Sequence, residues 1–205
     1  MLPPRMPGSV CGPWSAVHLA FSSPAEVKVA SPIGHVILGV GIAGATASAL
    51  GAEYTPALWV GAAIASCAPD LDLLPSLWGV PTWRVHRQAS HSILVLAPLS
   101  AVLWAALHPR QVGVDWRHLA AWGGALFSHL LLDILSSGPA LGERGHGIPL
   151  LWPLSARRWY VRRPILPDVN LLENPSPAAI ARACLWELVH LCPAAAAIIL
   201  LAHIL

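Results

Sequence analysis

Carboxylate and imidazole side chains are concentrated in one short stretch of an otherwise apolar chain. The stretch APDLDLLPSLWGVPTWRVHRQASHS, residues 68–92, contains Asp70, Asp72, His86 and His91. Both side-chain types offer lone pairs at neutral pH to divalent metals such as zinc, manganese and iron. This density of donors therefore indicates a divalent metal site.

Further donors of the same two types lie at other places in the chain. His129 and Asp133 are four residues apart in an apolar run. On a helix this spacing places both side chains on one face about one turn apart, which suits binding of one ion or bridging of two. His35 lies in the first turn of the first apolar run.

The composition of the chain is that of a membrane protein. Of the 205 residues, 56% are hydrophobic and only 11% are charged, and the mean hydropathy is +0.62. A soluble globular domain is much less apolar and more highly charged. The formal net charge of +2 gives no reason to predict nucleic-acid binding. The four cysteines form no CxxC pair and suggest no disulfide framework.

Apolar runs predict an all-α fold, a polytopic membrane helix bundle of about five spans with a metal site at one membrane face. The five runs are Pro32–Leu50, Thr55–Pro69, Ser92–Leu107, Leu119–Ser137 and Cys184–Leu205. A span needs roughly 17 to 25 residues, so each shorter run could instead be a buried core helix, and the second is the weakest candidate. Residues 1–30 are predicted to be a poorly ordered N-terminal extension, and residues 31–205 a membrane-embedded hydrolase domain.

Alternating spans would bring the distant donors to one membrane face. The start of the first run, the end of the second, the start of the third and the end of the fourth would share that face. An ionisable group at the bilayer centre costs about 2.5 to 3.5 kcal/mol, so several such groups at one level need an explanation. A shared metal is the simplest one.

Each motif also has a simpler interpretation when it is taken alone. PDLD could be a helix terminus, HRQASH a solvated loop with Ser90 as a helix N-cap, and the HxxxD pair an ordinary helix-surface contact. The convergence of all the motifs favours the metal site. The remaining isolated histidines are given no functional role; they are His108, His118, His190 and His203.

Five sequence motifs, in this order, resemble those of a known family. SPIGH, APDLDLLP, HRQASHS, SHLLLDILSSG and GIPLLWPLS resemble the YdjM-like family of LexA-regulated, inner-membrane-associated, metal-dependent hydrolases. The resemblance covers about residues 31–155 and continues loosely to the C-terminus. It implies a multi-span protein of the bacterial inner membrane with a divalent metal centre. The residues at the family's polar positions are His35, Asp70, Asp72, His86, His91, His129 and Asp133.

A more distant similarity is to zinc-dependent bacterial phospholipase C and related single-strand nucleases, whose helices carry a similar HxxxD pair. This similarity implies two or three metal ions that activate water and polarise a phosphoryl oxygen. One to three divalent ions are expected in all, with zinc first and manganese or iron as alternatives. Arg87 would then neutralise phosphate charge. His146 is a weaker candidate ligand, because a solvated loop position is the favoured interpretation of this residue.

Basic residues indicate the orientation in the membrane. Ten of the twelve lysines and arginines fall on the predicted metal-bearing side, and only Arg110 and Arg117 fall opposite. The positive-inside bias then predicts that the metal face is cytoplasmic and that the C-terminus is outside. Six arginines between residues 138 and 183, near Trp152, Trp159 and Tyr160, suggest either an interfacial anchor or a lip that collects an anionic substrate.

These observations favour an integral-membrane metal-dependent hydrolase that acts on a phosphoester or phospholipid. The expected partners are membrane lipid and an anionic phosphoester or lipid substrate, and the oligomeric state stays open. One alternative is a transporter that binds an ion transiently, although transport sites lie near the bilayer midplane and these donors lie at span ends. Another is a membrane protein with a structural metal and no turnover, because closed and open metal sites use the same residue types.

Overall fold

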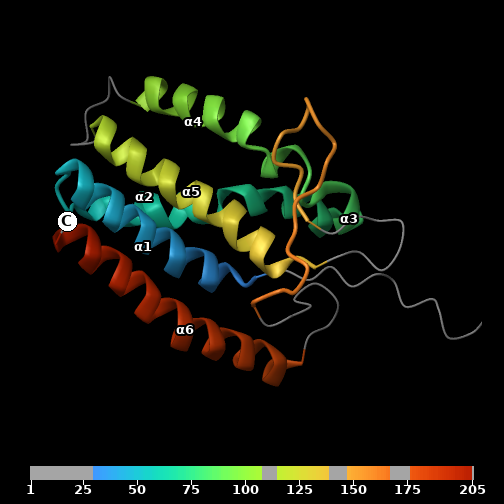
Figure 1. Ribbon diagram of the computed structural model, residues 1–205. Helices are drawn as coiled ribbons and strands as arrows, with labels where there is room; N and C mark the ends of the chain where they lie inside the picture. The colour runs from blue at the N-terminus through green and yellow to red at the C-terminus, as the bar shows by residue number, and fades with distance from the viewer. Residues whose placement is uncertain (1–29, 108–114, 139–146, 167–175, 205) are drawn as a thin grey trace, which may run out of the picture.

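The structure of the chain, a computed structural model, describes residues 30–107, 115–138, 147–166 and 176–204 (Figure 1). The predicted N-terminal extension, apart from Ala30, and the candidate ligand His146 lie outside these residues. The principal elements are α1 (Pro32–Leu50), α2 (Pro56–Cys67), η2 (Ala68–Trp78), α3 (Thr82–Val85), η3 (Ala89–His91), α4 (Ile93–Leu107), α5 (Trp116–Ser136) and α6 (Pro177–Ile204).

Helix α1 lies at the centre of the bundle and packs against α2, α5 and α6. Small residues permit this close packing, because a Cβ atom on Gly41 would lie 2.6 Å from the Cβ of Ala195 on α6. A core of mostly small, fully buried side chains fills the space between α1, α2 and α5. It consists of Ala43, Ala47, Leu58, Ala62, Ala121 and Ala125.

The predicted all-α membrane bundle is confirmed. The runs that are long enough to span the membrane differ from those predicted. Four helical segments have the length and apolar character of membrane spans, namely Pro32–Leu50, Pro56–Trp78, Trp116–Ser136 and Pro177–Ile204. The second run was the weakest candidate, yet α2 continues through η2 to 23 residues. The third run is the short one, because the 15 residues of α4 extend about 22 Å against a hydrocarbon core of about 30 Å.

The 3₁₀ segment η2 explains how aspartates can continue an apolar span. A 3₁₀ helix has three residues per turn, so residues three apart share one face. Leu71, Leu74 and Leu77 form such a face, and all three are exposed. Asp70 and Asp72 lie on the other two faces of η2 and are less exposed than the leucines, so the apolar stripe and the carboxylates do not compete for the same surface.

The chain alternates direction so that the predicted donor positions gather at one end of the bundle. In Figure 1 the start of α1, the whole of η2, α3 and η3, and the end of α5 lie together, while the C-terminal end of α6 lies at the opposite end. Helix α4 runs from the donor end beside α5. The topology therefore places the donors as alternating spans predict.

Candidate metal centre

The structure brings all seven predicted donors into one site. His35 comes from α1, Asp70 and Asp72 from η2, His86 and His91 from the segment after it, and His129 and Asp133 from α5. Six of them form three overlapping groups whose donor atoms lie within 4.8 Å of one another. We call these six residues the donor cluster: His35, Asp70, His86, His91, His129 and Asp133.

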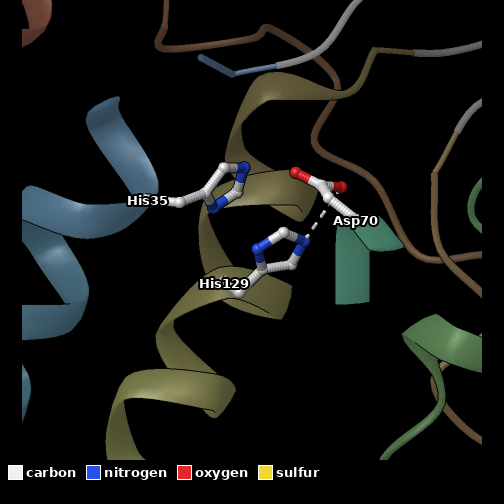
Figure 2. A group of neighbouring side chains, drawn as sticks. All are labelled: His35, Asp70 and His129. Atoms are coloured by element: carbon white, nitrogen blue, oxygen red, sulfur yellow. Dashed lines mark ion pairs between the residues drawn. The ribbon is translucent and has the colours of Figure 1, made fainter. Parts of the chain in front are cut away.

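Figure 2 shows one of the three groups, in which His35 and His129 face Asp70 across the space between α1, α5 and η2. The two imidazole rings stack with their centroids 3.8 Å apart. Nε2 of His129 lies 3.5 Å from Oδ1 of Asp70. His35 and His129 are almost fully buried, whereas the Asp70 side chain is 20% exposed, so Asp70 marks the accessible side of the cluster.

The distances within the cluster match those between ligands of a single metal ion. Nε2 of His91 lies 3.2 Å from Nε2 of His129, 3.0 Å from Oδ2 of Asp133 and 3.7 Å from Oδ1 of Asp70. In a tetrahedral site with ligand bonds of about 2.0 to 2.2 Å, two ligand atoms lie about 3.3 to 3.6 Å apart. Nε2 of His129 lies 3.7 Å from Oδ2 of Asp133. The donor atoms of His91, His129 and Asp133 therefore already have nearly the spacing that zinc requires.

A backbone carbonyl orients His129 toward the cluster. Nδ1 of His129 lies 2.6 Å from the carbonyl oxygen of Ser66 at the end of α2. Because a carbonyl only accepts, Nδ1 carries the proton and Nε2 presents its lone pair to the cluster. Metal-binding histidines commonly have this outer hydrogen bond.

Asp72 provides the corresponding contact for two other histidines. Its carboxylate lies 3.3 Å from Nδ1 of His91 and 2.9 Å from Nδ1 of His86. The hydroxyl of Ser90 also donates to this carboxylate. Nε2 of His91 faces the other donors while Nδ1 faces Asp72, so the geometry suits an orienting role for Asp72 at His91.

Among the described residues, two buried ring nitrogens in the site have no hydrogen-bond partner. They are Nδ1 of His35 and Nε2 of His86. A buried polar atom without a partner is costly, and each such atom in a folded protein needs an explanation. A bound cation would provide that explanation, because it would bind donor atoms that hydrogen bonds leave unsatisfied.

The electrostatics of the site favour a cation. Burial acts to lower the pKa of His91, but the carboxylates of Asp133, Asp70 and Asp72 outweigh burial and raise this pKa to about 10. His91 therefore holds a proton at neutral pH when it faces these carboxylates alone. A divalent ion bound by the same groups would take over the charge that this proton provides.

Arg87 supplies a second positive charge inside the site. Its guanidinium donates to Oδ1 of Asp133 at 2.6 Å and to the hydroxyl of Ser137 at 2.8 Å. Its backbone adopts φ 57°, in the left-handed region that is unusual for an arginine, and its N–H donates to Asp72. The side chain is buried and anchored beside the donors, and its role in neutralising a phosphate stays a prediction.

The loop of residues 147–166 covers the same end of the bundle. Ile148 and Trp159 form an antiparallel bridge. The guanidinium of Arg158 donates to the carbonyl oxygens of Gly147 and Arg87. The second of these bonds attaches the loop to the segment that carries His86 and His91. Arg157 lies over the ring of Trp159, 4.8 Å from its centroid. This position is compatible with both predicted roles of the basic, aromatic segment, an interfacial anchor and a lip that collects an anionic substrate.

Sequence reasoning missed the role of Glu187. This buried carboxylate on α6 accepts hydrogen bonds from the backbone N–H and the hydroxyl of Ser31, the N-cap of α1. A Cβ atom on Gly34 would lie 2.8 Å from the carboxyl carbon of Glu187, so the glycine permits this approach. A lone acid in an apolar run was the available signal. The HRQASH motif is also more buried than a solvated loop would be, because His86, Arg87 and His91 are all buried.

The comparisons with known proteins bear on the whole membrane domain. No curated protein and no solved structure matches the chain, so neither comparison supports the similarity to zinc-dependent phospholipase C. The family model described as YdjM inner membrane protein matches residues 31–204, a range that contains every helix and every donor described above. The chain therefore belongs to the YdjM inner membrane protein family.

Proposed function

We propose that this protein is an integral-membrane hydrolase that uses a divalent metal centre to cleave a phosphoester. The observation that carries the proposal is the donor cluster itself, a buried set of imidazoles and carboxylates at metal-ligand spacing with two unpartnered ring nitrogens. Imidazole and carboxylate donors suit zinc, with manganese and iron as alternatives. The three overlapping groups suit one to three ions.

A bound divalent ion would lower the pKa of a coordinated water toward neutrality and polarise a phosphoryl oxygen. The protein's own residues would orient the ligands, supply positive charge and admit the substrate. His91 and His129 present Nε2 inward because their outer nitrogens face Asp72 and the Ser66 carbonyl. Arg87 adds positive charge beside Asp133, where an anionic substrate group would be neutralised. Asp70 lies on the accessible side, where substrate would enter.

Metal analysis of the detergent-purified protein tests the ligand assignment. We expect bound zinc, manganese or iron in the unmodified chain and loss of most of it in His129→Ala and Asp70→Ala. His190→Ala is the matched control, because its imidazole is exposed on α6 and bonds only to the Trp186 carbonyl among the described contacts. Unchanged metal content in the first two variants would overturn the assignment.

A substrate panel then tests turnover. Phosphomonoesters, phosphodiesters and phospholipids would be incubated with the metal-loaded protein, with and without chelator. We expect hydrolysis of at least one class, abolished by chelator and restored by metal. A protein that keeps its metal but hydrolyses none of the panel would instead have a structural metal centre.

A further inference from the structure

An apolar groove of about 280 Å³ lies between α4 and α5. Its lining includes Ile93, Leu96 and Ala101 from α4 and Leu119, Phe127 and Leu130 from α5. Helix α4 contacts α5 and η3, and its contact with α5 is far less extensive than the contacts of α1 with α2, α5 and α6. This side of the bundle is therefore less tightly packed than the core around α1. The groove is not part of the donor cluster.

One end of the groove lies beside the donor cluster. Ile93 is two residues after His91, and Leu130 directly follows His129, so this end lies within about one helical turn of both ligands. The groove then follows α5 back to Leu119, which is about 16 Å of helix. That distance is about half of the roughly 30 Å hydrocarbon core, the depth that the acyl chain of one leaflet occupies.

A loop that carries basic residues is attached at the same end. The hydroxyl of Ser92 donates to the carbonyl oxygens of Leu150 and Trp152, and the N–H of Ile93 donates to Leu150. These bonds fix the loop of residues 147–166 against the start of α4. The loop carries exposed arginines that suit an anionic headgroup; they are Arg157, Arg162 and Arg163.

We propose that the groove between α4 and α5 holds one acyl chain of an anionic membrane phospholipid whose phosphate lies at the donor cluster. The substrate of the proposed hydrolase is then a lipid phosphoester that enters sideways from the bilayer. Water adds its oxygen to phosphorus, the phosphorus–oxygen ester bond breaks, and one water proton ends on the released alcohol oxygen. The hydrolysis step depends on the proposed function, whereas the binding of an acyl chain in the groove does not.

Gly123 provides a way to fill the groove without disturbing the helices. It lines the groove on α5, and a Cβ atom placed on it would meet no atom of the described residues within 4 Å. Gly123→Leu would therefore occupy space that the acyl chain needs, and Gly123→Ala would occupy less of it. Ala197→Leu is the matched control, because Ala197 is exposed on α6, outside the groove.

The binding test uses phosphatidic acid with a photoactivatable group on one acyl chain, in vesicles containing the full chain. We expect cross-links on α4 and α5, at groove residues such as Leu96, Leu126 and Phe127, which Gly123→Leu suppresses and Ala197→Leu leaves unchanged. Circular dichroism and metal content would show that each variant is folded. Cross-links spread over α6 and insensitive to Gly123→Leu would overturn the inference.

The turnover test compares phosphatidic acid with glycerol 3-phosphate, which has the same ester but no acyl chain. We expect Gly123→Leu to lower kcat/KM for phosphatidic acid by about tenfold or more, because one methylene in an apolar pocket is already worth about tenfold. The soluble ester should be unaffected. Groove cross-linking without hydrolysis of either ester would contradict the proposed function alone, and equal loss on both esters would contradict the groove.

Discussion

Asp72 differs from the other six predicted donors in its position relative to the imidazoles. Its carboxylate lies against Nδ1 of His91 and of His86 and belongs to none of the three donor groups found among the described residues. A carboxylate in that position fixes the tautomer and ring orientation of a metal-binding histidine. The structure therefore separates a residue that orients ligands from those placed to bind the ion.

We expect Asp72→Asn to weaken metal binding by about 10- to 100-fold without abolishing it, because loss of an orienting partner typically has this effect. An asparagine keeps one acceptor oxygen but presents an amide to the second imidazole. Competition with a chelator of known affinity would measure the change beside Asp70→Ala. Unchanged affinity would remove the orienting role, and complete loss equal to that of Asp70→Ala would make Asp72 a direct ligand.

Arg87 and Asp133 form a buried ion pair, and its contribution should depend on whether metal is bound. Removing one partner of such a pair typically costs about 3 to 5 kcal/mol, because the other charge stays buried without compensation. We expect Arg87→Ala to lower the thermal stability strongly in chelator and less when metal is present, since a cation also compensates Asp133. Thermal unfolding in detergent would measure both states.

The control for that measurement is Arg117→Ala, because the Arg117–Asp115 pair is 4.0 Å apart and its side chains are 41% and 48% exposed. Exposed pairs contribute about 0 to 1 kcal/mol, so this variant should unfold almost as the unmodified chain does. Equal destabilisation of Arg87→Ala with and without metal would contradict the shared role of arginine and metal at Asp133.

The helices themselves could be predicted from apolar runs, but several of their ends could not. The run Pro32–Leu50 coincides with α1, which Ser31 caps and Gly51 ends in a left-handed conformation. By contrast, α6 begins at Pro177, seven residues before the apolar run at Cys184, because PAAIARA contains mainly alanines and other good helix formers. Composition marks where a helix is apolar, whereas capping and propensity decide where it begins.

Close packing of α1 and α2 links a small residue to the orientation of a ligand. A Cβ atom on Gly39 would lie 2.4 Å from the Cβ of Ser66, and the Ser66 carbonyl holds His129. We expect Gly39→Ala to separate the helices at a cost of about 1 to 3 kcal/mol and to weaken metal binding. Thermal unfolding and metal titration would test this, with Gly123→Ala as the control, because its added Cβ atom would contact none of the described side chains.

The convergence of the donors could be predicted from counting spans, because alternating helices bring the ends of non-adjacent segments to one level. The finer arrangement could not. Neither the Ser66 carbonyl behind His129 nor the contact of Glu187 with Ser31 follows from spacing, since both depend on how the helices rotate about their axes. Small residues set those rotations through contacts that a single sequence does not reveal.

The arrangement of the whole molecule predicts its orientation in the membrane. The donor end and the C-terminal end of α6 lie at opposite ends of the bundle. Of the eight basic residues that the structure describes, seven belong to segments at the donor end and Arg117 belongs to the opposite end. The positive-inside bias therefore favours a cytoplasmic donor end and a C-terminus on the outer side. The same orientation would expose the proposed lipid groove to phospholipids of the inner leaflet.

Labelling of single cysteines in intact cells would test this orientation. In a chain whose four native cysteines are replaced by alanine, we expect a membrane-impermeant thiol reagent to modify Trp116→Cys and not Leu154→Cys. Both positions are exposed, at 56% and 84%, but Trp116 begins α5 at the far end while Leu154 lies in the loop over the donors. Permeabilised cells should label both. Labelling of Leu154→Cys alone in intact cells would show the opposite orientation. Another determinant of insertion would then override the charge bias.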